Sequence, residues 1–243
     1  MAERLLQLKQ RGPVLFVDAG NAFFSVPKLS EGRKAFERSR AELIAEAYHQ
    51  MGLRAYSPGV RDFSAGADFF WKVLKKSGAA AVSANLVGGG SGAKFESFLV
   101  VEEAGVRVVV TGLTSFHKTP VPVGIQWHEP KEAFRRVWRA IQAKSPNRVV
   151  VLSHLGAQED TSLAKEFPGL WIIGSQSMDF FSEPKKQGDS FLFEVGIGGQ
   201  RLGEVEVGSS GAGWSQAKLT ELGEAYDTPN AVKKLLQEFK KRK

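Results

Sequence analysis

Polar side chains follow several predicted strands at the points where those strands end. His154 comes after the apolar run Val149–Leu152, and Gln176 follows the run Trp171–Ile173. The other two such side chains are Asn21, after the run Val14–Val17, and Asn85, after the run Ala80–Ser83. Imidazole and amide groups can ligate a metal or form hydrogen bonds. Because ligands of parallel sheets gather at the carboxyl ends of the strands, a binding or active site is expected between these turns.

The elements that must position these side chains are short strands and amphipathic helices. The two runs Val149–Leu152 and Trp171–Ile173 are apolar and separated by a helix-length segment, which is typical of parallel strands joined by a crossover helix. Two antiparallel hairpins are also predicted, Phe95–Glu102 with Val106–Thr111, and Ser190–Gly196 with Arg201–Val207. The predicted helices are Ala2–Gln10, Arg33–Met51, Ala67–Lys76, Lys131–Lys144 and Thr228–Lys243. This order indicates a layered α/β fold with parallel and antiparallel pairs.

Composition excludes several classes of protein. The chain has 243 residues, 42% of them hydrophobic, and no cysteine, so disulfides, thiol catalysis and cysteine-based zinc sites are excluded. The net charge of +7 is concentrated at the two ends, and four of the last six residues are basic. No basic stripe is interleaved with aromatics, so nucleic acid is not an expected partner. No apolar run approaches the length of a membrane span.

The glycine cluster Gly88-Gly89-Gly90-Ser91-Gly92 has the composition of a phosphate-binding loop. It lacks the Lys-Ser/Thr pair of a P-loop, and no helical pattern begins directly after it. We therefore expect a flexible loop here.

Taken together, the strand-end turns resemble those of the 5'-nucleotidase branch of the calcineurin-like metallophosphoesterases, from about Ala2 to Val207. The matching segments are Val14–Phe23, Gly59–Gly66, Val82–Asn85, Val110–Thr114, Leu152–Gly156, Ile172–Met178 and Gln200–Gly203. The resemblance implies a four-layer sandwich of two mixed sheets flanked by helices. It implies one domain over residues 1–210, followed by a linker and a basic amphipathic helix over residues 211–243.

The resemblance also implies two divalent metals of the manganese or zinc type, and this chain departs from the family at their ligands. Asn21 stands where the family has its bridging Asp, and Val60-Arg61 stands where it has Asn-His. Gln176 and Met178 replace the final His-x-His pair, and the family's first Asp-x-His strand has no counterpart. His154 alone is kept. Valine cannot ligate and a guanidinium repels cations, so no metal cofactor is expected, and we interpret the chain as a catalytically inactive member.

Several alternatives remain open at this stage. Arg61 is predicted to hold a phosphate-like anion, with the remnant site completed by Asn21, Asp62, Asn85, His154 and Gln176. In the competing interpretation, Arg61 pairs with Asp62 or Asp18 and no anion binds. His154 is either a structural residue or, in an active enzyme, a catalytic one. The alternative function is a divalent-metal-dependent phosphoesterase or 5'-nucleotidase that acts on phosphomonoesters and takes its missing ligands from outside these residues.

The expected partners are a small anion or nucleotide and a protein that docks on the C-terminal helix. The absence of cysteine permits either a reducing or an oxidising compartment. A periplasmic or exported location is expected if a signal precedes these residues, and a cytoplasmic one otherwise.

Overall fold

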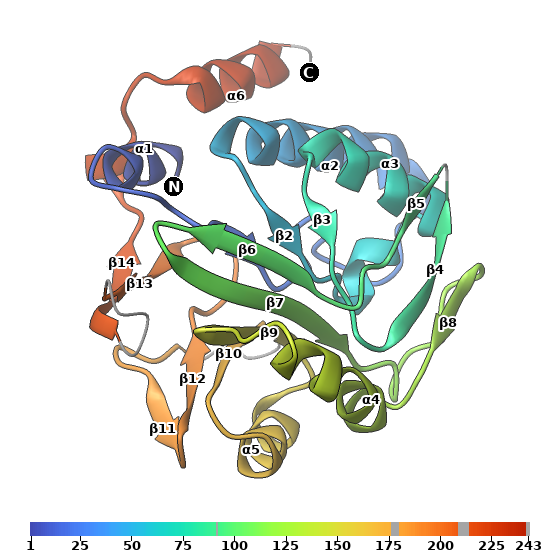
Figure 1. The fold of residues 1–243 in the computed structure, drawn as a ribbon. Helices are drawn as coiled ribbons and strands as arrows, with labels where there is room; N and C mark the ends of the chain where they lie inside the picture. Colours follow the sequence, from blue (N-terminus) through green and yellow to red (C-terminus); the bar gives the residue numbers. More distant parts are fainter. Residues whose placement is uncertain (91, 176–179, 209–213, 242–243) are drawn as a thin grey trace.

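Two facing sheets with helices on their outer sides form the body of the molecule (Figure 1). The computed structural model describes residues 1–243 except 91, 176–179, 209–213 and 242–243. The larger sheet has six strands in the order β11-β12-β10-β9-β7-β6, and the smaller sheet has the order β1-β2-β3. The six-stranded sheet contains β6 (Leu99–Glu103), β7 (Val106–Thr114), β9 (Arg148–His154), β10 (Leu170–Gly174), β11 (Lys185–Gln187) and β12 (Ser190–Glu194). The smaller sheet contains β1 (Val17–Asp18), β2 (Ala55–Tyr56) and β3 (Ala80–Ala81).

Three apolar cores hold the four layers together. Helices α2 (Glu31–Met51) and α3 (Ala67–Ser77) pack on the smaller sheet, around the aromatic side chains of Phe23, Tyr56 and Phe70. Between the sheets lie the side chains of a second core, which includes Val150, Leu152 and Trp171. On the outer face of the larger sheet, α4 (Pro130–Gln142) and α5 (Ala157–Glu166) cover a third core. The predicted four-layer α/β sandwich is therefore confirmed.

The central pair of parallel strands agrees with the sequence analysis. Leu170–Gly174 of β10 pairs in parallel with Val149–Ser153 of β9, and α5 forms the crossover between them. β9 in turn pairs in parallel with β7 over its whole length, so that His154 lies opposite Thr114. The antiparallel hairpin of β6 and β7 was also predicted correctly.

The second predicted hairpin is wrong. β12 pairs in parallel with β10 and antiparallel with β11, because its apolar side chains bury against the six-stranded sheet on both faces. β13 (Arg201–Val207) pairs instead with β14 (Trp214–Glu221), which lies in the segment expected to be a linker. The boundary at residue 210 stays a prediction.

Part of the glycine cluster lies in a strand where a loop was expected, since Gly88, Gly89 and Gly90 end β4, while Ser91 lies outside the described residues. β4 (Leu86–Gly90) pairs with β5 (Ala93–Lys94) and with β8 (Ile125–Trp127), a strand that the sequence analysis missed. A Cβ at Gly89 would overlap the carbonyl oxygen of Ala93, and one at Gly90 would lie 2.9 Å from the indole of Trp71. Glycine thus allows the close approach that this small sheet needs.

The chain ends pack onto the same side of the molecule. α1 (Ala2–Lys9) contributes Leu5 to the core beneath α2, and its Arg4 forms a bidentate ion pair with Glu204 of β13, with an N–O distance of 2.7 Å. After the short helix η2 (Glu224–Tyr226), α6 (Ala231–Lys241) lies along α2, with the ring of Phe239 6.1 Å from that of Phe36. Within the described residues, the helices are too short or too polar to cross a bilayer.

Candidate functional site

The carboxyl ends of β1 and β9 meet the short helix η1 (Val60–Phe63) at one edge of the sandwich. The turn after β1 and the loop before η1 pack backbone against backbone. A Cβ at Gly20, where φ is +97°, would overlap the backbone nitrogen of Gly59 and the carbonyl oxygen of Ser57. A Cβ at Gly59 would in turn overlap Asn21 and the imidazole of His154. Two glycines therefore permit the approach that brings Asn21, Arg61 and His154 together.

Asn21 is the centre of this cluster. Its backbone is left-handed, with φ of +61°, a conformation that asparagine tolerates better than most residues. The side-chain Oδ1 accepts a hydrogen bond of 3.0 Å from the backbone N–H of Arg61, and Nδ2 contacts Nε2 of His154. Since an amide NH₂ group can only donate, Nε2 must accept, which places the imidazole proton on Nδ1.

His154 is held neutral by its surroundings. The side chain is 2% exposed, and burial, helped by the charge of Arg61, lowers its pKa to about 4. A hydrogen bond to backbone raises the pKa by a smaller amount. At neutral pH the imidazole is therefore uncharged, and the lone pair of Nε2 is directed at Asn21.

Asp62 holds the backbone of the cluster in place through hydrogen bonds. Its carboxylate accepts hydrogen bonds from three backbone N–H groups, those of Asn21 at 2.7 Å, Gly59 at 2.9 Å and Phe23 at 3.2 Å. Burial raises the pKa of Asp62 to about 6, although these hydrogen bonds and one from Tyr56 oppose the shift. Its oxygens are committed to the backbone, so Asp62 positions Asn21 and is not directed at a ligand.

Arg61 is the cationic group of the cluster. Its Nη1 donates to the backbone carbonyl of Ser25 at 3.2 Å. Among the described residues no carboxylate lies within ion-pair distance of its guanidinium. Asp18 accepts instead from the Tyr48 hydroxyl at 2.6 Å and from the backbone N–H of Gly20 at 2.8 Å. The competing interpretation, in which Arg61 pairs with Asp18 or Asp62, therefore does not match the geometry.

Arg61 and Asn21 line one end of a large cavity of about 1220 Å³. Gly20 and Ser175 line the same end, and the hydroxyl of Ser175 donates to the carbonyl of Ala19 at 2.7 Å. The lining does not include Asp62, Asn85 or His154, which lie behind it. Gln176 and Met178 lie outside the described residues.

Asn85 is a structural residue in this arrangement. Its Nδ2 donates to the backbone carbonyls of Thr114 at 2.7 Å and His128 at 3.0 Å, and its Oδ1 accepts from the backbone N–H of Thr114 at 2.9 Å. The side chain is fully buried. It ties the end of β7 to the segment after β8, and these bonds leave it no group to offer a ligand.

We expect Asn85→Ala to lower the free energy of unfolding by about 2–3 kcal/mol, because the backbone N–H of Thr114 and the carbonyls of Thr114 and His128 each lose a hydrogen bond. Urea denaturation measures this loss. Phosphate affinity of the folded variant should stay within a factor of about two of the wild type, since Asn85 does not line the cavity. A large loss of affinity with little loss of stability would contradict this role.

Two further groups of buried polar residues escaped the sequence analysis. Tyr48 reaches Asp18 from α2, and burial raises the pKa of both groups. On the outer face of the larger sheet, the hydroxyl of Ser153 donates to Asp160 of α5, and Glu194 lies nearby over Gly174. Burial raises the pKa of Asp160 to about 7, the Ser153 hydrogen bond opposes this shift, and the charge of Glu194 adds to it. Ser153 lies in β9 and Asp160 in the α5 helix that follows it, but only the way α5 packs on the sheet shows that the two side chains meet.

The described donors do not match a two-metal centre. No three His, Cys, Asp or Glu side chains come together to hold a metal in the part of the chain that the structure describes. The imidazole nitrogen of His154 that faces the cluster already accepts from Asn21, and the guanidinium of Arg61 is close enough to lower the pKa of His154. A cation at this position would meet a positive charge and few oxygen donors.

No protein-family model and no curated protein sequence matches the chain. Solved structures do resemble it. Over 99% of its length it superposes on a 5'-nucleotidase precursor from Thermus thermophilus with a TM-score of 0.77 and 22% identity, and it covers 52% of that chain. For the sulfate thiohydrolase SoxB of Thermus thermophilus, solved with glycerol, the TM-score is 0.81 and the identity 19%, with 46% of that chain covered. For the calcineurin-like phosphoesterase YfkN of Bacillus subtilis the TM-score is 0.71 and the identity 17%, with 87% of that chain covered. The chain thus spans about half the length of the first two.

Proposed function

Because this chain has the metallophosphoesterase-like fold of the 5'-nucleotidases, we propose that it is a binding module that holds a phosphate-like anion beside Arg61 without two-metal catalysis. Arg61 carries the proposal. It has five N–H donors in a planar fork that suits the oxygens of a phosphate, and its hydrogen bond to the carbonyl of Ser25 uses one of them. Its charge has no carboxylate partner among the described residues, and it lines a cavity large enough for a ligand.

The neighbours of Arg61 support an anion more than a cation. Neutral His154 adds no charge. The side-chain amide of Asn21, which contacts His154, also accepts a hydrogen bond from the backbone N–H of Arg61 and so holds the backbone of Arg61 in place. Asp18 lines the same cavity, but burial raises the pKa of this carboxyl, and Tyr48 and Gly20 donate to it. The donor set therefore favours a role in which positive charge comes from the protein and not from bound metal.

Titration calorimetry with inorganic phosphate tests this proposal. We expect Arg61→Ala to weaken phosphate binding at least tenfold, about 1.4 kcal/mol, since it removes the charged donors. Arg61→Lys should retain part of the affinity, because it keeps the charge and loses the fork. Arg139→Ala, at an exposed arginine on α4, is the matched control and should leave the affinity unchanged. Phosphate binding that is absent in the wild type, or unaffected by Arg61→Ala, would overturn the proposal.

Measurements on the same purified protein distinguish the proposed binding module from the alternative function, a divalent-metal phosphoesterase. The fold and the placement of His154 at the end of β9 are what favour it. Purified protein is analysed for bound metal and assayed for phosphomonoester hydrolysis with added manganese. Stoichiometric metal together with turnover that is lost in His154→Gln would establish the alternative, and neither is expected.

A further inference from the structure

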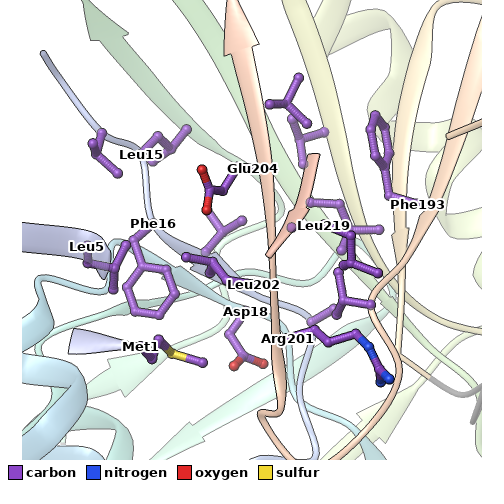
Figure 2. Close-up of a pocket in the computed structure, with 18 of the residues that line it drawn as sticks. Met1, Leu5, Leu15, Phe16, Asp18, Phe193, Arg201, Leu202, Glu204 and Leu219 are labelled. Atoms are coloured by element: carbon purple, nitrogen blue, oxygen red, sulfur yellow. The ribbon is translucent and has the colours of Figure 1, made fainter. Parts of the chain in front are cut away.

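The cavity of about 1220 Å³ lies between the smaller sheet and the ribbon of β13 and β14, above the six-stranded sheet (Figure 2). Figure 2 shows Leu15 and Phe16 on one side of it, Leu202 and Leu219 near the other, and Phe193 beside it. Val150, Trp171 and Ile173 of the larger sheet also line it. The walls are more apolar than polar, although charged side chains also line the cavity, among them Arg61, Arg201 and the ion-paired Glu204.

The two strands that border the cavity belong to one interrupted layer. In the segment that leads into β1, Phe16 faces the core beneath the helices, whereas Leu15 and Val17 face the core between the sheets. β13 repeats this alternation, since Leu202 packs in the helix-side core and Val205 in the inter-sheet core. Matching faces on both strands mean that β1 and β13 lie at the same depth, with the cavity where a strand between them would run.

The border on the β1 side is an open strand edge. The carbonyls of Phe16 and Asp18 accept hydrogen bonds from the backbone N–H groups of Arg54 and Ser57, on the β2 side, at 2.9 and 3.1 Å. Adjacent residues of a strand direct their backbone groups to opposite edges, so Leu15 and Val17 direct theirs away from β2, into the cavity that they line. Within the described residues, β1 pairs with β2 alone.

The border on the β13 side is open in the same way. The N–H of Leu222 donates to the carbonyl of Gln200 at 2.8 Å, which identifies that pair as hydrogen-bonded. In an antiparallel ladder, hydrogen-bonded pairs alternate with pairs that are not hydrogen-bonded. The backbone groups of Leu202 and Glu204 therefore point toward β14, whereas those of Gly203 point to the opposite edge of β13. Arg201 and Val205 do the same. In the described part of the chain, β13 pairs with β14 only.

We propose that an extended peptide segment of a partner chain inserts into this cavity as a strand between β1 and β13. Backbone N–H and C=O groups that border an apolar cavity are costly when unpaired, and only another extended backbone offers both edges donors and acceptors at the right repeat. A compact apolar ligand would fill the space but leave both edges open. The inserted segment is about as long as β13, seven residues, and apolar on both faces, because it lies between Leu5 of α1 and the side chains of the larger sheet.

Amide hydrogen exchange of the full chain, with and without a synthetic peptide, tests the inference. The probe is a lysine-flanked peptide of alternating valine and alanine, apolar on both faces and as long as β13, seven residues. In the free protein we expect the amides of Leu15, Val17 and Gly203 to exchange much faster than those of Val150 and Val151 in β9. The peptide should slow their exchange at least about tenfold.

The control is the same peptide N-methylated at every second residue, which keeps the side chains but removes the donors on one edge. It should give no protection at β1 or β13, or protection at one of them only. Three results would each overturn the inference: free-protein protection of Leu15, Val17 and Gly203 equal to that of β9; no change on adding the unmodified peptide; or equal protection by both peptides. None of these readouts depends on phosphate binding at Arg61, so the two proposals succeed or fail separately.

Discussion

Gly20→Ala is expected to lower the free energy of unfolding by about 4 kcal/mol or more, the largest loss among the single substitutions considered. Two effects add. The φ of +97° is unfavourable for any residue with a Cβ, and the new methyl group would overlap backbone atoms of Ser57 and Gly59. Backbone cannot move aside as a flexible side chain can, so the turn after β1 must separate from the loop before η1. Urea denaturation followed by circular dichroism measures the loss.

Gly66→Ala is the matched control. Gly66 has a φ of +92°, but a Cβ there would meet nothing within 4 Å. It therefore carries the conformational strain without the overlap, and a loss of about 1–2 kcal/mol is expected. If Gly20→Ala does not fold, the prediction is met only when Gly66→Ala does fold. Equal stability of the two variants would show that the contact between the two turns contributes nothing.

Asp160→Asn is expected to stabilise the protein at alkaline pH. Burial raises the folded-state pKa of Asp160 from 3.8 to about 7, so the folded chain keeps a proton that the unfolded chain releases. The unfolded state then binds fewer protons between about pH 4 and 7, and stability falls as the pH rises through that window. Asparagine resembles the protonated acid and still accepts from Ser153. The gain over the wild type should be about 2–4 kcal/mol at pH 8 and under about 1 kcal/mol at pH 4.

The difference between variant and wild type is the quantity to plot, because other buried groups titrate in the same range. Asp62, whose pKa is raised to about 6, also makes stability fall with rising pH, whereas His154, whose pKa is lowered to about 4, makes it rise. Both are common to the two proteins and cancel in the difference. Asp189→Asn, at an exposed turn, makes the same chemical change without burial and is the matched control. A pH-independent difference for Asp160→Asn would refute the argument.

The two proposals concern different parts of the same cavity. At the polar end Arg61 offers a charge to an anion, and along its length β1 and β13 offer hydrogen bonds to a peptide. A bound strand would bring its own side chains next to Asn21 and Arg61. Titrating phosphate in the presence of the synthetic peptide would show whether the two ligands help or hinder each other.

The sequence by itself determined the layered architecture and the edge at which the polar groups gather. Apolar β-branched runs such as Val149–Leu152 favour buried parallel strands, and their periodicity does not depend on distant residues. Asn21 and His154 each follow a strand, as expected, but β1 belongs to the smaller sheet and β9 to the larger one. The two side chains meet because the facing sheets have these strand ends on the same side of the molecule.

The tertiary structure alone decided which strands pair and which polar groups are free. β12 and β13 have the pattern of a hairpin, yet burial of apolar side chains against β10 on both faces of the sheet outweighs the local turn. Likewise the local sequence does not show which of Arg61, Asp62 and Asn85 can reach a ligand. In the structure the side chains of Asp62 and Asn85 form hydrogen bonds with backbone groups, whereas the side chain of Arg61 lines the cavity. Hydrogen bonds between residues far apart in sequence form only once the layers pack, so the strand pairing could not be predicted from spacing.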